Sequence, residues 1–388
     1  MIAFGPATLE NLSNSEPASI YGIDVASGAM KPLTNQHWAE LGKMVWTSDG
    51  SGLVLVARDP RIGNQIYYLS YPTGEVRRIT NGLRGFGNYG LGITADSKTI
   101  VADSWETSAQ LWLVGADGNT SRAVPLTSGD YDGRRGLAGL PDGRIVYVAR
   151  DGGEYDFWTV KADGTDAKAL TADPFNDSQI AAAHDGRHLV FTSDRAGGSH
   201  IFRADADGSH PQQLTFGESQ DGAPDFSPDG QWVVYASILN DKATIWKIPA
   251  AGGTPARLTD YEGVAPSFSP DGKFVSCIVP SASIPERGSI DVISVEGGTP
   301  VKSFNVVPFS WNYLNARWTP DGQGLIFPKE ENQVTNLWRQ AIAGGAPQRF
   351  TDFKTDIIVN YAYTQNGRNI ILSRGQRTVN VVLISNFK

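Results

Sequence analysis

Two adjacent arginines, Arg134 and Arg135, follow the acidic and aromatic segment Asp130–Gly133. A guanidinium group can bind carboxylate or phosphate oxygens through two parallel hydrogen bonds, and it also stacks on aromatic rings. Neither a turn nor a strand at this position requires two arginines. The pair therefore indicates part of a ligand-binding surface. The alternative is an internal ion pair with a nearby carboxylate from Asp130, Asp132 or Asp177.

Acidic and aromatic residues also occur in the other segments that connect the expected repeats. Carboxylates such as Asp132, Asp177 and Asp221 could perform the chemistry of a lyase or hydrolase if they converged in a closed pocket. Aromatic side chains interleaved with both charge signs are typical of a recognition surface, although each aromatic could instead fill a gap in the core. The complete candidate set is Trp38, Phe86, Tyr89, Tyr131, Asp132, Arg134, Arg135, Asp177, Asp221, Trp311 and Tyr313.

Three other patterns carry less weight. Gly85–Gly90 matches G-x-G-x-x-G, but a phosphate site needs a helix after the glycines and a strand is expected there. The lone Cys277 cannot form an internal disulfide, and its apolar surroundings predict a buried thiol. Four of the five histidines fall in one repeat, at opposite ends of its strands, so we expect neither a metal site nor any cofactor; they are His184, His188, His200 and His210.

The candidate residues are embedded in a repeated pattern of turns. A turn of the type seen at Ser227–Gly230 and Ser269–Gly272 recurs eight times, at intervals of 42 to 50 residues. A second turn, such as Asp163-Gly164, follows 21 to 26 residues after the first in seven consecutive repeats. Proline presets one backbone angle of such a turn, and Asp with Gly supplies the tight reversal.

Short β-branched and aromatic segments, such as Trp232–Tyr235, separate the turns. Four antiparallel strands in each repeat of about 45 residues predict an all-β fold, the β-propeller. We expect one ring of eight four-stranded blades over residues 1–388, with seven blades possible. Pairing of Met30–Thr34 with Val379–Ser385 would close it. Residues 1–18 are then a surplus, as if the chain were cut from a longer parent with further repeats upstream.

Composition excludes several classes of protein. Ten Trp, thirteen Tyr and sixteen Phe predict a large packed core rather than disorder. No stretch reaches the roughly 18 consecutive apolar residues of a membrane span, so we expect no membrane insertion. A net charge of -8 offers no basic surface for nucleic acid. Met1–Leu12 lacks the features of a signal peptide. We expect the chain to be a monomer.

Ser193-Asp194-Arg195, followed by Ala206-Asp207-Gly208 and Leu214-Thr215, resembles the TolB-like propeller repeat, a WD40-like repeat. Trp46–Asp59 and the ending Val382–Phe387 resemble more closely the C-terminal sensor propeller of bacterial membrane-anchored serine/threonine protein kinases and winged-helix regulators. The resemblance covers nearly the whole chain. It implies an extracytoplasmic, periplasmic module for sensing or protein binding, with the kinase or DNA-binding part upstream. The chain itself carries no kinase motif.

We therefore expect a non-catalytic propeller that binds a protein segment or a small ligand. We name the four strands of each repeat A to D in chain order. The binding face would be the channel mouth, where the connections from each strand D to the next strand A gather. The alternative is a propeller enzyme, a lyase or hydrolase using Asp132, Asp177 and Asp221. A converging carboxylate pair or metal cluster would favour the enzyme. A broad mouth without such convergence would favour binding.

Overall fold

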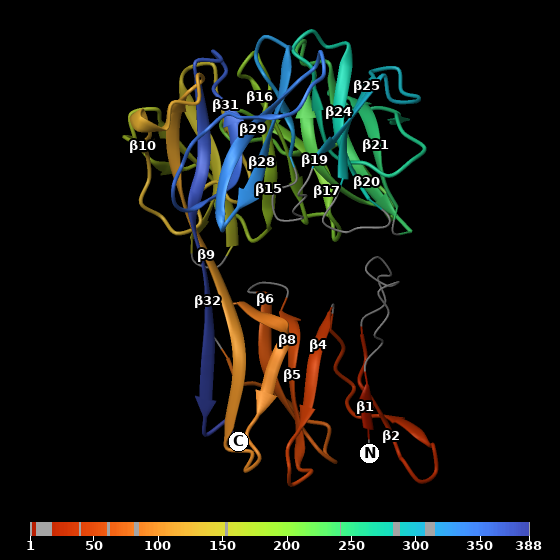
Figure 1. Cartoon of the computed structure of the whole chain (residues 1–388). Coiled ribbons are helices and arrows are strands. Elements are labelled where there is room, and N and C mark those ends of the chain that lie inside the picture. Colours follow the sequence, from red (N-terminus) through yellow and green to blue (C-terminus); the bar gives the residue numbers. More distant parts are fainter. Residues whose placement is uncertain are drawn as a thin grey trace. The chain divides into compact units, whose positions relative to one another are not determined.

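The computed structural model describes residues 2–4, 18–38, 40–59, 63–80, 85–151, 154–240, 242–281, 288–306 and 315–387 (Figure 1). Nearly all the regular structure in these ranges is antiparallel β-strand, and the one helix among them is the single turn η1 (Thr120–Arg122). None of the described segments is a helix with the length and apolar composition needed to cross a membrane. The chain divides into two compact units, which we call the small unit (Met1–Thr107 with Arg377–Lys388) and the ring unit (Ser108–Gln376).

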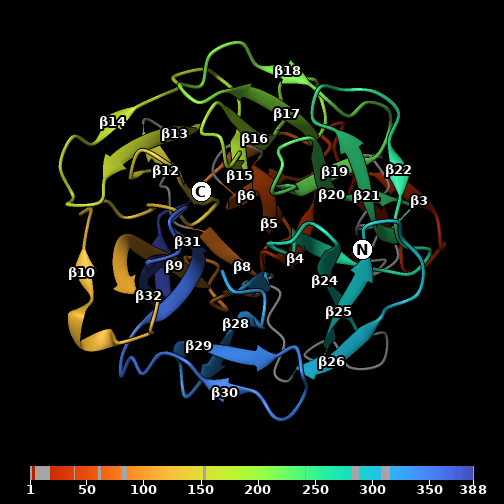
Figure 2. The ribbon, with the colours of Figure 1, turned by 90° about the horizontal axis from the view of Figure 1, so that it is seen from above.

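The ring unit contains five sheets that are each formed by four consecutive strands. In every one the strands pair with their sequence neighbours, from the innermost strand at the channel to a short outermost strand (Figure 2). Their bounds are β11 (Leu137–Gly139), β12 (Arg144–Asp151), β13 (Glu154–Lys161), β14 (Lys168–Ala169); β15 (Asp177–Ala182), β16 (His188–Ser193), β17 (His200–Asp205), β18 (Gln212–Gln213); β19 (Gln220–Phe226), β20 (Trp232–Leu239), β21 (Lys242–Pro249), β22 (Ala256–Arg257); β23 (Val264–Phe268), β24 (Phe274–Pro280), β25 (Gly288–Ser294), β26 (Lys302–Val306); β27 (Arg317–Trp318), β28 (Gly324–Glu331), β29 (Val334–Ala341) and β30 (Gln348–Arg349).

A sixth sheet of the ring unit combines strands from distant parts of the sequence. Its order is β31 (Ile357–Tyr363), β32 (Asn369–Ser385), β9 (Thr99–Gly115) and β10 (Val124–Pro125). The Ala116 N–H donates to the Arg368 carbonyl at 2.9 Å, which ties the end of β9 to the start of β32. The later segments thus supply the two inner strands and the earlier segments the two outer ones.

Apolar clusters join neighbouring sheets all around the ring unit. Between β11–β14 and β15–β18, the rings of Phe157 and Phe191 pack edge to face with centroids 4.9 Å apart. The sixth sheet is packed on both sides, because Leu111 joins the cluster of Ile145 and Val114 joins the cluster of Leu337. The remaining three joints have clusters of the same kind. With an apolar joint at each of its six junctions, the ring is closed by packing as well as by strand pairing.

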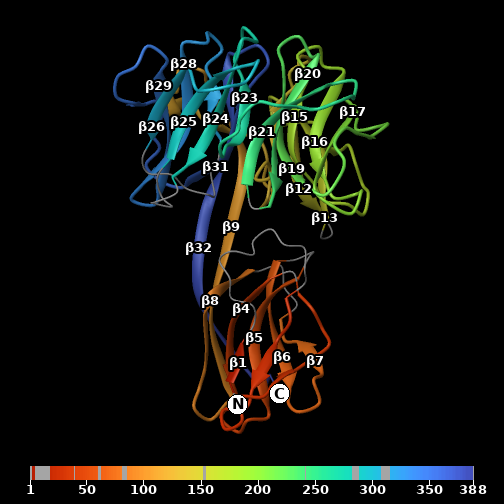
Figure 3. The same cartoon turned by 90° about the vertical axis from the view of Figure 1, so that its right-hand side faces the viewer.

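The small unit is a stack of three sheets (Figure 3). Trp38 and Leu55 belong to the cluster that joins the first sheet to the second. Ile66 and Phe387 belong to the cluster that joins the second to the third. The sheets are β1 (Ile2–Phe4), β2 (Tyr21–Ile23), β3 (Met30–Pro32); β4 (Leu41–Trp46), β5 (Gly52–Asp59), β6 (Gly63–Ser70), β7 (Val76–Arg78); and β8 (Gly85–Ile93) with the first part of β9 and the last part of β32.

The all-β propeller of four-stranded antiparallel blades expected from the sequence is confirmed, but the single ring of eight blades is not what forms. The described residues of the ring unit give six blades, and β3 pairs with β2 rather than with Val379–Ser385. The reason is that β9 and β32 are continuous 17-residue strands. We expected each to fold into a B–C hairpin, yet Asp103–Ser108 contains no Gly, Pro or Asn. Elsewhere Asn332 and Gln333, both at positive φ, turn β28 into β29.

Two repeated polar contacts account for the repeated sequence patterns. In the turn before β20, the Ser227 hydroxyl donates to Asp229 Oδ1 at 2.5 Å, and the same oxygen accepts the Gln231 N–H at 3.0 Å. Just after the outermost strand of six sheets, a threonine hydroxyl accepts a main-chain N–H of the strand before it, as Thr215 does from Ile201 at 3.0 Å. Both devices satisfy backbone groups that the strand ladder leaves open.

Replacing Asp229 by alanine should lower the free energy of unfolding by about 1 kcal/mol, since two hydrogen bonds of the turn are lost. These donors hold the pKa of Asp229 below its ordinary value of 3.8. A depressed folded-state pKa means that the contribution is present above pH 3.8 and is lost as pH falls through the lower value. The difference between variant and parent should therefore shrink in acid. Urea unfolding at pH 7 and pH 3 measures both effects.

Asp185→Ala is the matched control, because Asp185 stands in the equivalent turn and, among the described residues, its side chain accepts only the Arg187 N–H. The loss of unfolding free energy should be smaller in Asp185→Ala than in Asp229→Ala. Equal costs for the two variants would show that the hydroxyl contact contributes nothing.

Candidate functional site at the channel mouth

An open cavity of about 370 Å³ lies in the ring unit, near the start of the innermost strand of every sheet. All six sheets, or the connections that lead into them, contribute to its lining. The lining residues are Arg134–Gly136, Ser178–Ile180, Ala223–Pro224, Ala265–Ser267, Asn315–Arg317 and Val359–Asn360.

Bulges in the innermost strands shape this lining. The register of β15 shifts between Ser178 and Ala181, and β19, β23 and β31 shift at comparable places. Gln179, Ala223 and Ala265 occupy three of these bulges with φ near +50°. A bulge leaves a residue unpaired and re-aims the side chains beside it. The repeated bulge thus frees residues of the innermost strands to line the cavity.

Arg134 and Arg135 are held at the cavity by tyrosine rings. The Arg134 guanidinium carbon lies 5.7 Å from the centre of the Tyr131 ring, and that of Arg135 lies 3.9 Å from the centre of the Tyr155 ring. Arg150 lies within 5.6 Å of both rings. Such cation–π contacts attract a guanidinium group to the ring face and so help to orient it. The structure thus brings the predicted residues Tyr131, Arg134 and Arg135 together.

The sixth sheet positions the segment that carries these arginines. The Asp132 N–H donates to the Ala109 carbonyl of β9 at 2.9 Å, and the Ser373 hydroxyl of β32 donates to the Asp132 carbonyl at 2.7 Å. Gly133 has a φ of +70°, a left-handed conformation that favours glycine, and a Cβ there would lie 2.6 Å from a methyl group of Leu111. Closure of the ring therefore fixes one side of the cavity.

Three polar residues from separate sheets complete the lining. Arg317, at the start of β27, donates from Nε to the Tyr361 carbonyl at 3.0 Å. Gln179 Oε1 accepts the Ala223 N–H at 2.8 Å. Asn360 Oδ1 accepts the Tyr361 N–H at 2.8 Å. None of the three was predicted from the sequence. A signal was available for Asn360, which is a polar residue inside the otherwise apolar and aromatic strand β31.

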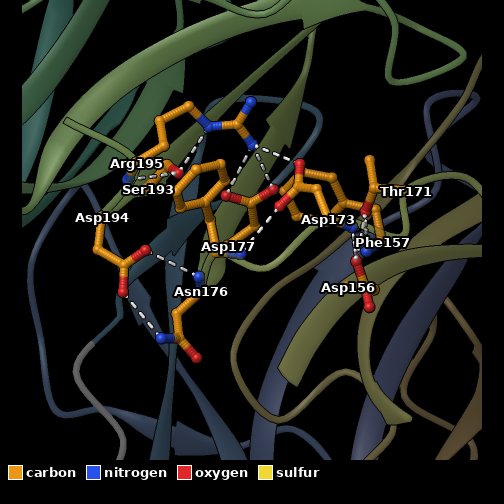
Figure 4. A network of polar contacts seen from close by, with 10 residues as sticks. Asp156, Phe157, Thr171, Asp173, Asn176, Asp177, Ser193, Asp194 and Arg195 are labelled. Carbon is orange, nitrogen blue, oxygen red and sulfur yellow. Dashed lines mark hydrogen bonds and ion pairs between the residues drawn. The ribbon is translucent and has the colours of Figure 1, made fainter. Parts of the chain in front are cut away.

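Asp177 lies outside the lining and forms an ion pair at the start of β15 (Figure 4). Its carboxylate is 1% exposed and lies 2.9 Å from Nη2 of Arg195, which also contacts Asp173 at 3.1 Å. Burial raises the pKa of Asp177 to about 6, while Ser193 and Arg195 act in the opposite direction. The arrangement explains Ser193-Asp194-Arg195 of the repeat as a structural motif.

The other two carboxylates proposed for an enzyme are also buried away from this lining. Asp132 Oδ2 accepts the Gly129 N–H at 3.1 Å, and burial raises the pKa of Asp132. Asp221 Oδ2 lies 3.4 Å from Nδ1 of His200. In the part of the chain that the structure describes, no three His, Cys, Asp or Glu side chains gather where they could hold a metal ion.

Three of the remaining candidates, Trp38, Phe86 and Tyr89, belong to the small unit. Trp38 and Phe86 are 4% and 5% exposed in the core of the small unit, because the sheets there stack over them. This corrects their expected place on a recognition surface. Tyr89 is 83% exposed on β8 of the same unit. Trp311 and Tyr313 lie outside the described residues.

A second cavity of about 300 Å³ shares Arg317, Ile180 and Ser267 with the first. Asp225 belongs to its lining and accepts the Phe268 N–H at 3.0 Å. Burial raises the pKa of Asp225, and the positive charge of Arg317 opposes that shift. Asp225 is thus a carboxylate of the channel that is not among the residues predicted from the sequence.

The glycine-rich segment and the cysteine have structural explanations. A Cβ at Gly90 or Gly87 would lie 1.5 or 2.1 Å from the carboxylate of Asp103, so these glycines of β8 leave room for that side chain. Cys277 is fully buried in a cluster with Val275, and burial raises its pKa to about 12. Of the histidines, His184 lines the second cavity and His210 contacts Asp205 at the surface.

Residues 138–306 match the family model described as the TolB beta propeller domain. Comparison with curated proteins gives no match. A chain of a solved nidogen/laminin complex aligns with 70% of this chain and 98% of its own length, at 13% identity and a TM-score of 0.50. TolB from Acinetobacter baumannii aligns with 94% of this chain and 78% of its own length, at 12% identity and a TM-score of 0.46. Oligogalacturonate lyase from Vibrio parahaemolyticus aligns with 91% of this chain and 96% of its own length, at 11% identity and a TM-score of 0.39. At such low identities the comparison extends to the fold alone.

Proposed function

We propose that this chain is a non-catalytic binding module that takes up a protein segment or a small ligand at the channel mouth of the ring unit. The observation that carries the proposal is the makeup of the cavity. All six sheets contribute to one open site, and its described lining contains three arginines and three side-chain amides but no Asp, Glu, His or Cys. Such a lining can recognise a ligand and offers no side chain for acid–base or metal chemistry at neutral pH.

The enzyme alternative has less support. A lyase or hydrolase would need a pair of carboxylates facing a substrate. Asp177 is paired with Arg195, and Asp221 contacts His200. Asp132 accepts the Gly129 N–H from its own loop. None of the three lines either channel cavity. Their hydrogen bonds and ion pairs instead hold the segments that lead into the innermost strands.

The same proposal includes a cellular setting. The module would be the sensor or interaction part of a larger bacterial signalling protein, acting outside the cytoplasm as a monomer. The match of residues 138–306 to the TolB propeller model supports the assignment of the module as a propeller. The resemblance of the ending Val382–Phe387 to sensor propellers supports the rest.

Peptides selected for binding to this chain from a random display library should bind at the channel mouth. The double substitution Arg134→Ala with Arg135→Ala should weaken their binding at least tenfold, because both guanidinium groups line the cavity. The measurement is a titration of each selected peptide against parent and variant, together with the melting temperature of both proteins.

The control removes the same charge elsewhere: Arg122→Ala with Arg187→Ala, both exposed and outside the cavity. It should leave peptide binding unchanged. If every selected peptide binds the Arg134/Arg135 variant as well as the parent while that variant stays folded, the channel mouth is not the binding site.

A further inference from the structure

We propose that the ligand group received by the channel mouth is a carboxylate, bound by Arg317 together with the side-chain amides of Gln179 and Asn360. This inference rests on the proposed function of the same cavity. The three side chains come from the starts of β27, β15 and β31, so the group would be held from three separate sheets of the ring unit.

The two amides present N–H groups to the cavity because their oxygens are already committed. A main-chain N–H can only donate, so the atom that accepts it must be the amide oxygen. The Ala223 N–H therefore fixes Oε1 of Gln179, which also accepts the Thr192 hydroxyl at 2.9 Å. The Tyr361 N–H fixes Oδ1 of Asn360 in the same way. The amide nitrogens of both residues have no hydrogen-bond acceptor among the described residues.

Arg317 adds a positive charge that is held in place from one side. Its Nε donates to the Tyr361 carbonyl, and its main-chain N–H donates to the Tyr361 hydroxyl at 3.3 Å. Within the described residues, Nη1 and Nη2 have no hydrogen-bond acceptor and no carboxylate within 4.0 Å. A guanidinium edge beside two amide NH₂ groups supplies several donors and a full charge, which is the complement of a carboxylate.

The charges around the cavity favour an anion. Arg134 and Arg135 add to the charge of Arg317, whereas Asp225 in the adjoining cavity offsets part of it. The arginines attract both a carboxylate and a phosphate group. Free inorganic phosphate lacks the further contacts that a peptide makes with the rest of the cavity, so we expect it to bind more weakly than a carboxylate peptide.

The volume of about 370 Å³ is that of a small-ligand pocket and admits a few residues of a peptide. A peptide can present a carboxylate at its C-terminus or on an acidic side chain. Three acetylated tripeptides separate these sources: Ala-Ala-Ala with a free C-terminus, Ala-Asp-Ala-amide, and neutral Ala-Ala-Ala-amide. Inorganic phosphate is the fourth probe.

Calorimetric or NMR titration of the full chain should show binding of at least one carboxylate peptide and at least tenfold weaker binding of the neutral amide and of phosphate. Arg317→Gln should weaken binding of the carboxylate peptide at least tenfold, whereas the control Arg187→Gln should leave its affinity unchanged. Asp225→Asn should strengthen binding of the carboxylate peptide severalfold, because a negative charge near Arg317 is removed. The asparagine oxygen can still accept the Phe268 N–H, so the fold should be kept.

Equal binding of the neutral amide, tighter binding of phosphate, or an Arg317→Gln variant that is folded and binds normally would each overturn the carboxylate assignment. Asp225→Asn binding more weakly than the parent would overturn the charge argument. These failures are distinguishable from failure of the proposed function. Library peptides that depend on Arg134 and Arg135 but not on a carboxylate would leave the binding module standing and remove only the assignment of its ligand group.

Discussion

Replacing Gly375 by alanine should lower the free energy of unfolding by about 3 kcal/mol, the upper end of the usual cost of forcing extra atoms into a packed site. Gly375 lies in β32 where that strand passes β9. A Cβ at this position would lie 1.9 Å from the Ser108 carbonyl oxygen and 2.8 Å from Cα of Ala109. Both obstacles are main chain and cannot rotate away as a side chain could. The two strands would have to separate, and the sixth sheet depends on their pairing.

Urea unfolding followed by tryptophan fluorescence measures the expected loss. Gly92→Ala is the matched control, because Gly92 is also a strand glycine and a Cβ there would meet only the Val101 carbonyl, at 3.9 Å. That variant should be within about 0.5 kcal/mol of the parent. A Gly375→Ala protein as stable as Gly92→Ala would mean that β9 and β32 do not approach as the structure has them.

Leu111→Ala should cost about 3 kcal/mol, within the range for truncating a buried leucine. Leu111 is fully buried on β9, in the cluster that joins the sixth sheet to β11–β14. Truncation leaves a cavity at the joint that closes the ring. Because the joint holds two sheets together, hydrogen exchange should become faster in both β11–β14 and β31.

Leu383→Ala supplies the comparison, since Leu383 is 66% exposed on β32 and buries little surface. It should leave both the unfolding free energy and the exchange pattern unchanged. If Leu111→Ala behaves like Leu383→Ala, or if exchange quickens only within one sheet, the sixth sheet does not close the ring.

Local features of the fold could be predicted from the sequence because they depend on neighbouring residues. The turn at Ser227–Gly230 is such a case, since its hydrogen bonds join residues at most five positions apart. Strand type and blade composition follow from the same local pattern. The number of blades does not, because β9 and β32 pair across more than 250 residues. The absence of Gly, Pro and Asn in Asp103–Ser108 was a usable signal that β9 does not fold into a hairpin.

The candidate site was predicted in part for the same reason. Arg134 and Arg135 stand out as an unusual pair in one connection, and both line the cavity. Arg317, Gln179 and Asn360 are single polar residues in three distant repeats, and only closure of the ring makes them neighbours. Asp177 was misjudged as a channel residue because its partner Arg195 is visible in the sequence but their pairing is not.

The composite sixth sheet also sets when this protein can finish folding as it leaves the ribosome. Its outer strands, up to Pro125, are synthesised more than two hundred residues before β31 begins at Ile357. At about 5 to 20 residues per second, that interval lasts roughly 10 to 50 s. Throughout it, Leu111 lacks its partners Ala362 and Ile371, and Val114 lacks Ile358 and Ile370, because β31 and β32 supply them. The sixth sheet is therefore incomplete, and the apolar surfaces that it covers stay partly exposed. Any chain that stops before Ile357 would keep those surfaces exposed, so truncated products should be cleared or aggregate rather than persist as smaller working modules.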